Sequence, residues 1–332
     1  MSAGFTYHGG RLSAACARFG GEPADWLDLS TGINPRSWHP GADVVVDWRA
    51  LPDPDALASL EYAAAAFFGC DPALCAAVPG SETGLRQLGQ SLALPGLHQP
   101  LAYGTYRAAF AQAESIQNLA QLPQRASVLV VGNPNNPDGR ILSHDRLLAL
   151  LDHQEQQGGW LIVDEAFADY DPGWSILGKV DAGRRLIVLR SFGKFFGLAG
   201  LRLGFLIAPP KVLADLRQGL GDWPIHAAAL AFATPAYRDM PWITGTRRCL
   251  GASAAALDDV LKRHRLSFKG DCPLFRLIVG QNAGGLFQAL AARQILTRPF
   301  SGHPDLLRIG LPANAAALQR LDMALSEVGG HG

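Results

Sequence analysis

A hydroxyl, a lysine and an arginine lie at fixed intervals in one glycine-rich stretch, at Ser191, Lys194 and Arg202. Lysine forms a Schiff base with a carbonyl group, whereas a hydroxyl and an arginine suit a phosphate. The glycines let the backbone pass close to a bulky ligand. The stretch therefore predicts a site for a phosphorylated carbonyl compound such as pyridoxal phosphate (PLP), and a surface lysine in a flexible loop is the alternative.

Two further polar motifs follow apolar runs. An asparagine-rich turn over residues 133–139 follows the run 128–131, and Asp164 and Glu165 follow the run 161–163. A carboxylate at the end of a buried strand is costly unless it meets a cation. The ring nitrogen of PLP would be such a cation for Asp164, and an ordinary buried ion pair is the alternative.

The strands and helices expected around these motifs predict an α/β fold. Four short runs are almost wholly apolar, as in strands buried on both faces: 128–131, 161–163, 186–189 and 205–207. Helical segments separate several of them, which predicts a mostly parallel sheet between helices. Ligands of such sheets bind at the carboxyl ends of the strands, where the polar motifs fall.

The chain is long enough for more than one domain. Residues 36–224 are expected to form a large PLP-binding domain, because the strand-like runs lie there. The segment Trp223-Pro224 interrupts the pattern, and residues 225–332 are expected to form a smaller α+β domain. Residues 1–35 are expected to be an N-terminal arm that contributes to the active site and to the small domain.

Composition limits the function classes. Lys plus Arg total 29, as do Asp plus Glu, so no net charge favours nucleic acid or an anionic membrane. The five cysteines show no CxxC spacing, and neither a metal site nor a disulfide framework is indicated. No apolar run resembles a signal peptide or a membrane span. A cytoplasmic protein is expected.

The polar motifs together resemble the active-site set of the fold type I PLP enzymes, the aspartate aminotransferase superfamily. The resemblance implies a large domain with a mostly parallel sheet, a small C-terminal domain, bound PLP and a homodimer. It implies that Lys194 and Asp164 are catalytic, with Lys194 linked to the cofactor and Asp164 paired with its ring nitrogen. The cofactor-binding residues that it implies are Gly80, Ser81, Glu82, Tyr106, Asn136, Asp164, Phe167, Ser191, Lys194 and Arg202.

Two segments sharpen the resemblance, His8-Gly9-Gly10 and Thr31-Gly32-Ile33-Asn34-Pro35. They are similar to segments of the threonine-phosphate decarboxylase family of cobalamin biosynthesis. This resemblance implies decarboxylation of a phosphorylated amino acid, L-threonine O-3-phosphate, to (R)-1-amino-2-propanol O-2-phosphate. The substrate-binding residues that it implies are His8, Asn34, Asn136, Arg298 and Arg308. A histidinol-phosphate aminotransferase-like enzyme and a non-catalytic PLP-fold binding protein or regulator remain the alternatives.

Overall fold

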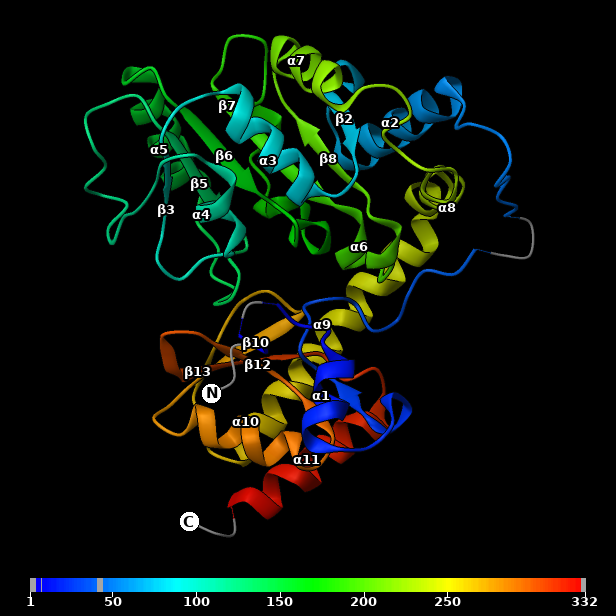
Figure 1. The fold of residues 1–332 in the computed structure, drawn as a ribbon, viewed down its shortest axis with the longest axis vertical. Coiled ribbons are helices and arrows are strands. Elements are labelled where there is room, and N and C mark those ends of the chain that lie inside the picture. Colours follow the sequence, from blue (N-terminus) through cyan, green and yellow to red (C-terminus); the bar gives the residue numbers. More distant parts are fainter. Residues whose placement is uncertain (1–3, 7, 41–43, 330–332) are drawn as a thin grey trace. The chain divides into compact units, whose positions relative to one another are not determined.

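The computed structural model describes residues 4–6, 8–40 and 44–329, which divide into two units (Figure 1). The larger unit takes the described residues of 37–136 and 141–245. The smaller unit takes those of 1–36, 137–140 and 246–332. Residues 1–3, 7, 41–43 and 330–332, which fall in the three expected domains, lie outside the description.

The division between the units falls at residues 245–246, whereas the sequence predicted a boundary at 224–225. It lies within helix α9 (Met240–Arg263). The difference arises because α8 (Ala227–Arg238) packs on α2 (Pro54–Phe68) of the larger unit. The ring of Tyr237 in α8 lies 5.1 Å from that of Phe67 in α2.

A mostly parallel sheet forms the core of the larger unit, as the sequence predicted (Figure 1). Its strand order is β2-β8-β7-β6-β5-β3-β4. The strands are β2 (Cys75–Val78), β3 (Gly96–His98), β4 (Ala113–Ser115), β5 (Val128–Gly132), β6 (Trp160–Asp164), β7 (Leu186–Ser191) and β8 (Gly204–Ile207). Strand β8 runs antiparallel to both neighbours, and the pairs from β4 to β7 are parallel.

Helices cover this sheet and bury its apolar strands. Helix α3 (Ser81–Ser91) packs on β7 and β8, α5 (His144–Gln156) packs on β6, and α2 packs on β2. At the start of α5, Ser143 Oγ accepts a hydrogen bond from the N–H of Arg146, and Gly69 ends α2 with a φ of 76°. This unit also contains α4 (Thr105–Ala109), α6 (Phe192–Phe195) and α7 (Pro210–Leu220).

The smaller unit is built on an antiparallel sheet of order β12-β13-β10-β9. Its strands are β9 (Phe268–Lys269), β10 (Phe275–Val279), β12 (Arg298–Phe300) and β13 (His303–Gly310), and its helices are α1 (Leu12–Phe19), α10 (Ala283–Ala291) and α11 (Ala315–Gly329). The N-terminal segment packs here: β1 (Leu27–Asp28) pairs in parallel with β11 (Ile295–Leu296), and the rings of Phe5 and Phe19 pack on Phe287.

Candidate active site

One pocket in the larger unit lies at the carboxyl ends of the parallel strands. Asn136 follows β5, Asp164 ends β6 and Ser191 ends β7. The structure brings together in this pocket all ten residues that the sequence predicted to bind a cofactor. Those residues are Gly80, Ser81, Glu82, Tyr106, Asn136, Asp164, Phe167, Ser191, Lys194 and Arg202.

Lys194 reaches the pocket from a short helix that follows β7 directly. Strand β7 ends at Ser191 and α6 begins at the next residue, so the hydroxyl and the amine are three residues apart along one tight turn. Gly193 allows this turn to pack closely, because a Cβ atom there would lie 2.5 Å from the Cα atom of Ala199. The turn is therefore braced against the segment that leads to Arg202.

Asp164 has both carboxylate oxygens fixed by hydrogen bonds. The hydroxyl of Tyr106 donates to Oδ2 over 2.9 Å, and the N–H of Ala166 donates to Oδ1 over 3.1 Å. Burial raises the pKa of Asp164, while those two hydrogen bonds and the charge of Lys194 act in the opposite direction. Because burial disfavours the charged form of Asp164, a cationic ligand beside it would stabilise that form.

Replacing Asp164 with asparagine should stabilise the cofactor-free protein at neutral pH. Because the folded pKa is raised, the wild-type protein loses stability as pH rises from the ordinary carboxyl pKa of about 3.9 towards the folded value. Asp164→Asn removes this cost. We expect the free energy of unfolding to rise by about 1 kcal/mol at pH 7.

Urea unfolding of the cofactor-free variants between pH 3.5 and about pH 8 measures this difference. The gain should shrink as pH falls towards the ordinary carboxyl value. The exposed Asp215→Asn is the matched control and should show no such pH dependence. An Asp164→Asn protein that is less stable than wild type throughout this range would contradict the interpretation.

Groups that suit an anion lie close together where α3 begins. Gly80 precedes this helix with a φ of 87° and offers no side-chain hydrogen bond to its first turn. A Cβ atom at Gly80 would lie 2.7 Å from Nη2 of Arg202, so only glycine lets this guanidinium approach the helix start. Strand β8 also comes close, since a Cβ atom at Gly204 would lie 2.4 Å from the nitrogen of Ser81.

These donors fit a phosphorylated pyridine aldehyde. Backbone N–H groups at a helix N-terminus, the Arg202 guanidinium and the Ser191 hydroxyl suit a phosphate dianion. Asp164 suits a protonated ring nitrogen, and Lys194 suits a carbonyl carbon. The cradle at Gly80 and the Asp164 carboxylate, fixed by two hydrogen bonds, are therefore the observations on which the fit to PLP rests.

The pocket also contains residues that the sequence analysis did not identify, which are Tyr103, Pro134 and Ala166. The hydroxyl of Tyr103 donates to Oε2 of Glu82 over 2.9 Å, and the other oxygen of Glu82 accepts from Arg86. Burial raises the pKa of Tyr103 to about 12. The side chain of Glu82 is thus held by Tyr103 and Arg86, so its backbone is the part of Glu82 that suits a ligand. Tyr103 lies three residues before Tyr106, and this spacing could have indicated that both tyrosines line the same pocket.

In the smaller unit, Arg298 and Arg308 are direct cross-strand partners on β12 and β13. Both side chains are buried and lie over aromatic rings, Arg298 over Phe300 and Arg308 over Phe275. Burial lowers the pKa of Arg308 well below its usual value, and the like charge of Arg298 lowers it further. Two buried guanidinium groups side by side create a strong local demand for an anion.

The N-terminal segment supports this arginine pair. Nη2 of Arg308 donates to the carbonyl oxygen of Ser30 over 2.8 Å, and the N–H of Gly10 donates to Ser30 Oγ over 2.7 Å. A Cβ atom at Gly9 would lie 2.3 Å from that same carbonyl oxygen. His8, which is half-buried, therefore begins a segment that packs on the residue holding Arg308.

Asn34 is buried in the smaller unit, and its Oδ1 accepts a hydrogen bond from the N–H of Arg36 over 3.0 Å. This contact shapes the turn after the Thr31-Gly32-Ile33 segment. Across residues 4–6, 8–40 and 44–329, no group of three or more metal-ligating side chains converges on a point. Over the same ranges, no helix has both the length and the apolar character required to cross a bilayer.

Residues 101–324 match the family described as Aminotransferase class I and II. The chain belongs to this family. It is 38% identical to the threonine-phosphate decarboxylase of a Sinorhizobium species, over 97% of this chain and 98% of the relative. It is 39% identical to that of Pseudomonas aeruginosa, over 96% of each chain. The crystal structure of L-threonine-O-3-phosphate decarboxylase from Porphyromonas gingivalis shares the fold, with a TM-score of 0.74 at 18% identity over 91% of this chain and 99% of that one.

These findings confirm both resemblances that the sequence motifs indicated, to the superfamily and to the decarboxylase family. They also confirm the predicted fold class. The roles of the individual residues come from the motifs and the pocket, and they are taken up as proposals below.

Proposed function

We propose that this chain is a PLP-dependent decarboxylase that converts L-threonine O-3-phosphate to (R)-1-amino-2-propanol O-2-phosphate in cobalamin biosynthesis. The observation that carries the proposal is the near full-length identity of 38–39% to two threonine-phosphate decarboxylases. The pocket supports it because Lys194 and Asp164, the two groups that PLP chemistry requires, line it together.

Each part of the cofactor has a matching group in the pocket. Lys194 would carry the aldehyde carbon, Asp164 would pair with the ring nitrogen, and Asn136 would contact the ring hydroxyl. Tyr106 would lie against the ring while its hydroxyl holds Asp164 in place. The phosphate would be held by Ser191, Arg202 and the backbone that begins α3. Phe167 lines the same pocket and has no hydroxyl to offer the ring.

When bound, PLP supplies a conjugated ring that accepts the electron pair left at Cα as CO2 departs. Asp164 would pair with the protonated ring nitrogen, because a carboxylate that is partly removed from water favours a nearby cation. The Nζ of Lys194 would hold the proton that is delivered to Cα. Pocket walls such as Tyr106 and Phe167, both almost fully buried, exclude water from this proton transfer.

The substrate has two anionic groups, and the smaller unit has two buried arginines in register. We assign Arg308 to the carboxylate and Arg298 to the phosphate, each as a charge-assisted contact. His8 and Asn34 are proposed as weaker contributors to the same substrate, and Asn136 as a contact on the cofactor side. By binding the carboxylate, Arg308 would orient the substrate and favour cleavage of the bond to the carboxylate over other bonds at Cα.

We further propose that the enzyme is a cytoplasmic homodimer. Large apolar side chains stand exposed in the larger unit, with Val45 at 82%, Trp48 at 76% and Leu51 at 66% exposure. Such a group of apolar side chains on one segment suits burial against a second copy. The five cysteines, all of them described, form no disulfide, in keeping with a reducing compartment. Light scattering at two protein concentrations tests the dimer.

The purified enzyme should release CO2 from threonine phosphate without any added 2-oxo acid. Decarboxylation leaves the amino group on the product, so no acceptor is needed to restore the cofactor. An aminotransferase must pass the amino group to a 2-oxo acid before it can turn over again. The measurement is CO2 released per active site, with and without 2-oxoglutarate, and the product is identified by mass.

Histidinol phosphate with 2-oxoglutarate is the comparison substrate for this assay. Rapid reaction of that pair, with no CO2 from threonine phosphate, would show that the protein is an aminotransferase. Binding of PLP without turnover of either substrate would favour a non-catalytic regulator.

A further inference from the structure

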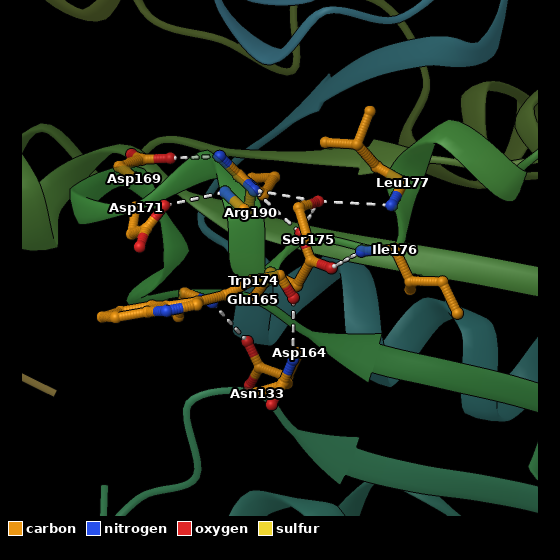
Figure 2. A network of polar contacts seen from close by, with 12 residues as sticks. Asn133, Asp164, Glu165, Asp169, Asp171, Trp174, Ser175, Ile176, Leu177 and Arg190 are labelled. Carbon is orange, nitrogen blue, oxygen red and sulfur yellow. Dashed lines mark hydrogen bonds and ion pairs between the residues drawn. The ribbon is translucent and has the colours of Figure 1, made fainter. Parts of the chain in front are cut away.

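A buried ion cluster lies directly beside the two strand ends that carry Asp164 and Ser191 (Figure 2). Nη1 of Arg190 lies 2.8 Å from Oε2 of Glu165, and Nη2 of Arg190 lies 2.6 Å from Oδ1 of Asp169. The three side chains are at most 3% exposed. The cofactor chemistry proposed above uses none of them.

The cluster is tied to the segment that follows β6 (Figure 2). Ser175 Oγ donates to Oε2 of Glu165, and the N–H of Ile176 donates to Oε1 over 2.8 Å. On the other side, the Arg190 guanidinium lies 4.7 Å from the ring centre of Phe68 in α2. Arg190 is thus enclosed by protein on both sides.

A second set of contacts joins the same segment to the β5 end (Figure 2). The side-chain amide of Asn133 donates to the carbonyl of Trp174 over 2.9 Å, and its backbone N–H donates to the carbonyl of Asp164 over 2.8 Å. Asn133 lies three residues before Asn136 in the turn after β5. The ends of β5, β6 and β7 are therefore cross-linked behind the pocket.

The position of the cluster follows from strand geometry. Side chains alternate between the faces of a strand, so the neighbour of a pocket residue points away from the pocket. Glu165 is the neighbour of Asp164, and Arg190 is the neighbour of Ser191. The N–H of Glu165 also donates to the carbonyl of Leu189 over 2.9 Å, which fixes the two strand ends in one register.

We propose that Arg190, held by Glu165 and Asp169, is a positioning residue that sets the placement of Asp164 and Ser191 for the cofactor. The inference rests on the proposed function only in taking PLP as the ligand. The cluster acts through the two pocket residues and touches neither cofactor nor substrate. A substitution that breaks an ion pair of the cluster should therefore raise the dissociation constant for PLP.

A purely structural role is the competing explanation. Buried ion pairs often contribute little net stability, and breaking one by removing a partner leaves a costly uncompensated charge. Such a role would lower the stability of the cofactor-free protein. It would leave the PLP affinity of the folded molecules unchanged. The two explanations therefore predict different dissociation constants for PLP. These are measured under conditions in which every variant is folded.

The test compares Arg190→Lys, Arg190→Met and Glu165→Gln with a matched control at the other end of β7. Arg184 precedes that strand and also pairs with two carboxylates, Glu155 at 2.9 Å and Asp152 at 3.0 Å, but in a partly exposed position. Cofactor-free protein of each variant, including Arg184→Met, is titrated with PLP. The free energy of unfolding is measured on the same samples, and so is the pH at which the absorption of the bound cofactor changes.

We expect Glu165→Gln and Arg190→Met to weaken PLP binding by about 10-fold to 100-fold, the range found when groups that orient metal ligands are removed. Arg190→Lys keeps the charge and should restore part of the affinity. Arg184→Met should stay within about 3-fold of wild type, because an exposed pair contributes little. If Arg190→Met does not fold, the milder Glu165→Gln and Arg190→Lys decide the outcome.

Equal PLP affinity and an equal spectroscopic pH transition in Glu165→Gln and wild type would overturn the inference, whichever substrate reacts. A protein that binds PLP and shows these shifts, but converts histidinol phosphate in place of threonine phosphate, would overturn the proposed decarboxylation alone. The inference about Arg190 would then stand.

Discussion

The Lys194→Ala enzyme should release CO2 from threonine phosphate at least about 10⁴-fold more slowly than wild type. Lys194 is the lysine among the residues that line the pocket, so its loss removes both the covalent attachment of PLP and the proposed proton donor to Cα. Non-covalent binding of PLP should persist, because the Asp164 and Arg202 contacts are untouched. Activity therefore falls far more than cofactor content.

Borohydride reduction of the wild-type holoenzyme followed by peptide mapping measures the attachment directly. The pyridoxyl group should appear on Lys194. The matched control is Lys211→Ala, which changes an 86% exposed lysine of the same unit and should keep full activity and attachment. A pyridoxyl group found on another lysine would remove Lys194 from its assigned role.

Truncation of the two buried arginines should separate substrate binding from turnover. Arg298→Ala should weaken threonine phosphate by on the order of 2 to 5 kcal/mol, the cost of removing one partner of a desolvated charge pair. Its effect should appear mainly in KM. Arg308→Ala should also lower kcat at saturating substrate, because the carboxylate is no longer held in the orientation that favours loss of CO2.

The measurement is kcat and KM for threonine phosphate, together with the preference for threonine phosphate over threonine. Arg298→Ala should reduce that preference, and both variants should still bind PLP. Arg293→Ala provides a control in the same unit, because Arg293 is partly exposed and pairs with Glu327 away from the two buried arginines. An Arg298→Ala enzyme that discriminates as well as wild type would show that Arg298 does not bind the phosphate.

Most of the larger unit could be predicted from the sequence because its strands are apolar runs of the kind that parallel sheets bury. Strands β5 and β6 contain the predicted runs and are longer than them by one and two residues. Their polar ends meet at one sheet edge, which brings Asn136, Asp164 and Ser191 into one pocket. Apart from Lys194 and Arg202, the rest of the ten pocket residues were predicted from the family resemblance alone. The short strands β3 and β4 lack such a run and were not anticipated.

The sequence did not predict which side chains far apart in the chain would contact one another. The Tyr106 hydroxyl meets Asp164 across 58 residues, and Arg190 meets Glu165 across 25. Residue types show that a buried carboxylate needs a partner, but they do not select one among many. Glu165 pairs with Arg190, and Asp164 accepts a hydrogen bond from Tyr106, and neither partner could be selected from the sequence.

The pairing of Arg298 with Arg308 makes the proposed contacts with the substrate depend on the register of one β-hairpin. A slip of one residue would turn either side chain to the opposite face of the sheet. The ladder is interrupted between Pro299 and Phe300, on the side toward the turn at Gly302. A bulge absorbs irregularity locally, so insertions or deletions at the turn need not reach the arginines. A change in the length of the hairpin tip should therefore leave the two guanidinium groups on the same face of the sheet.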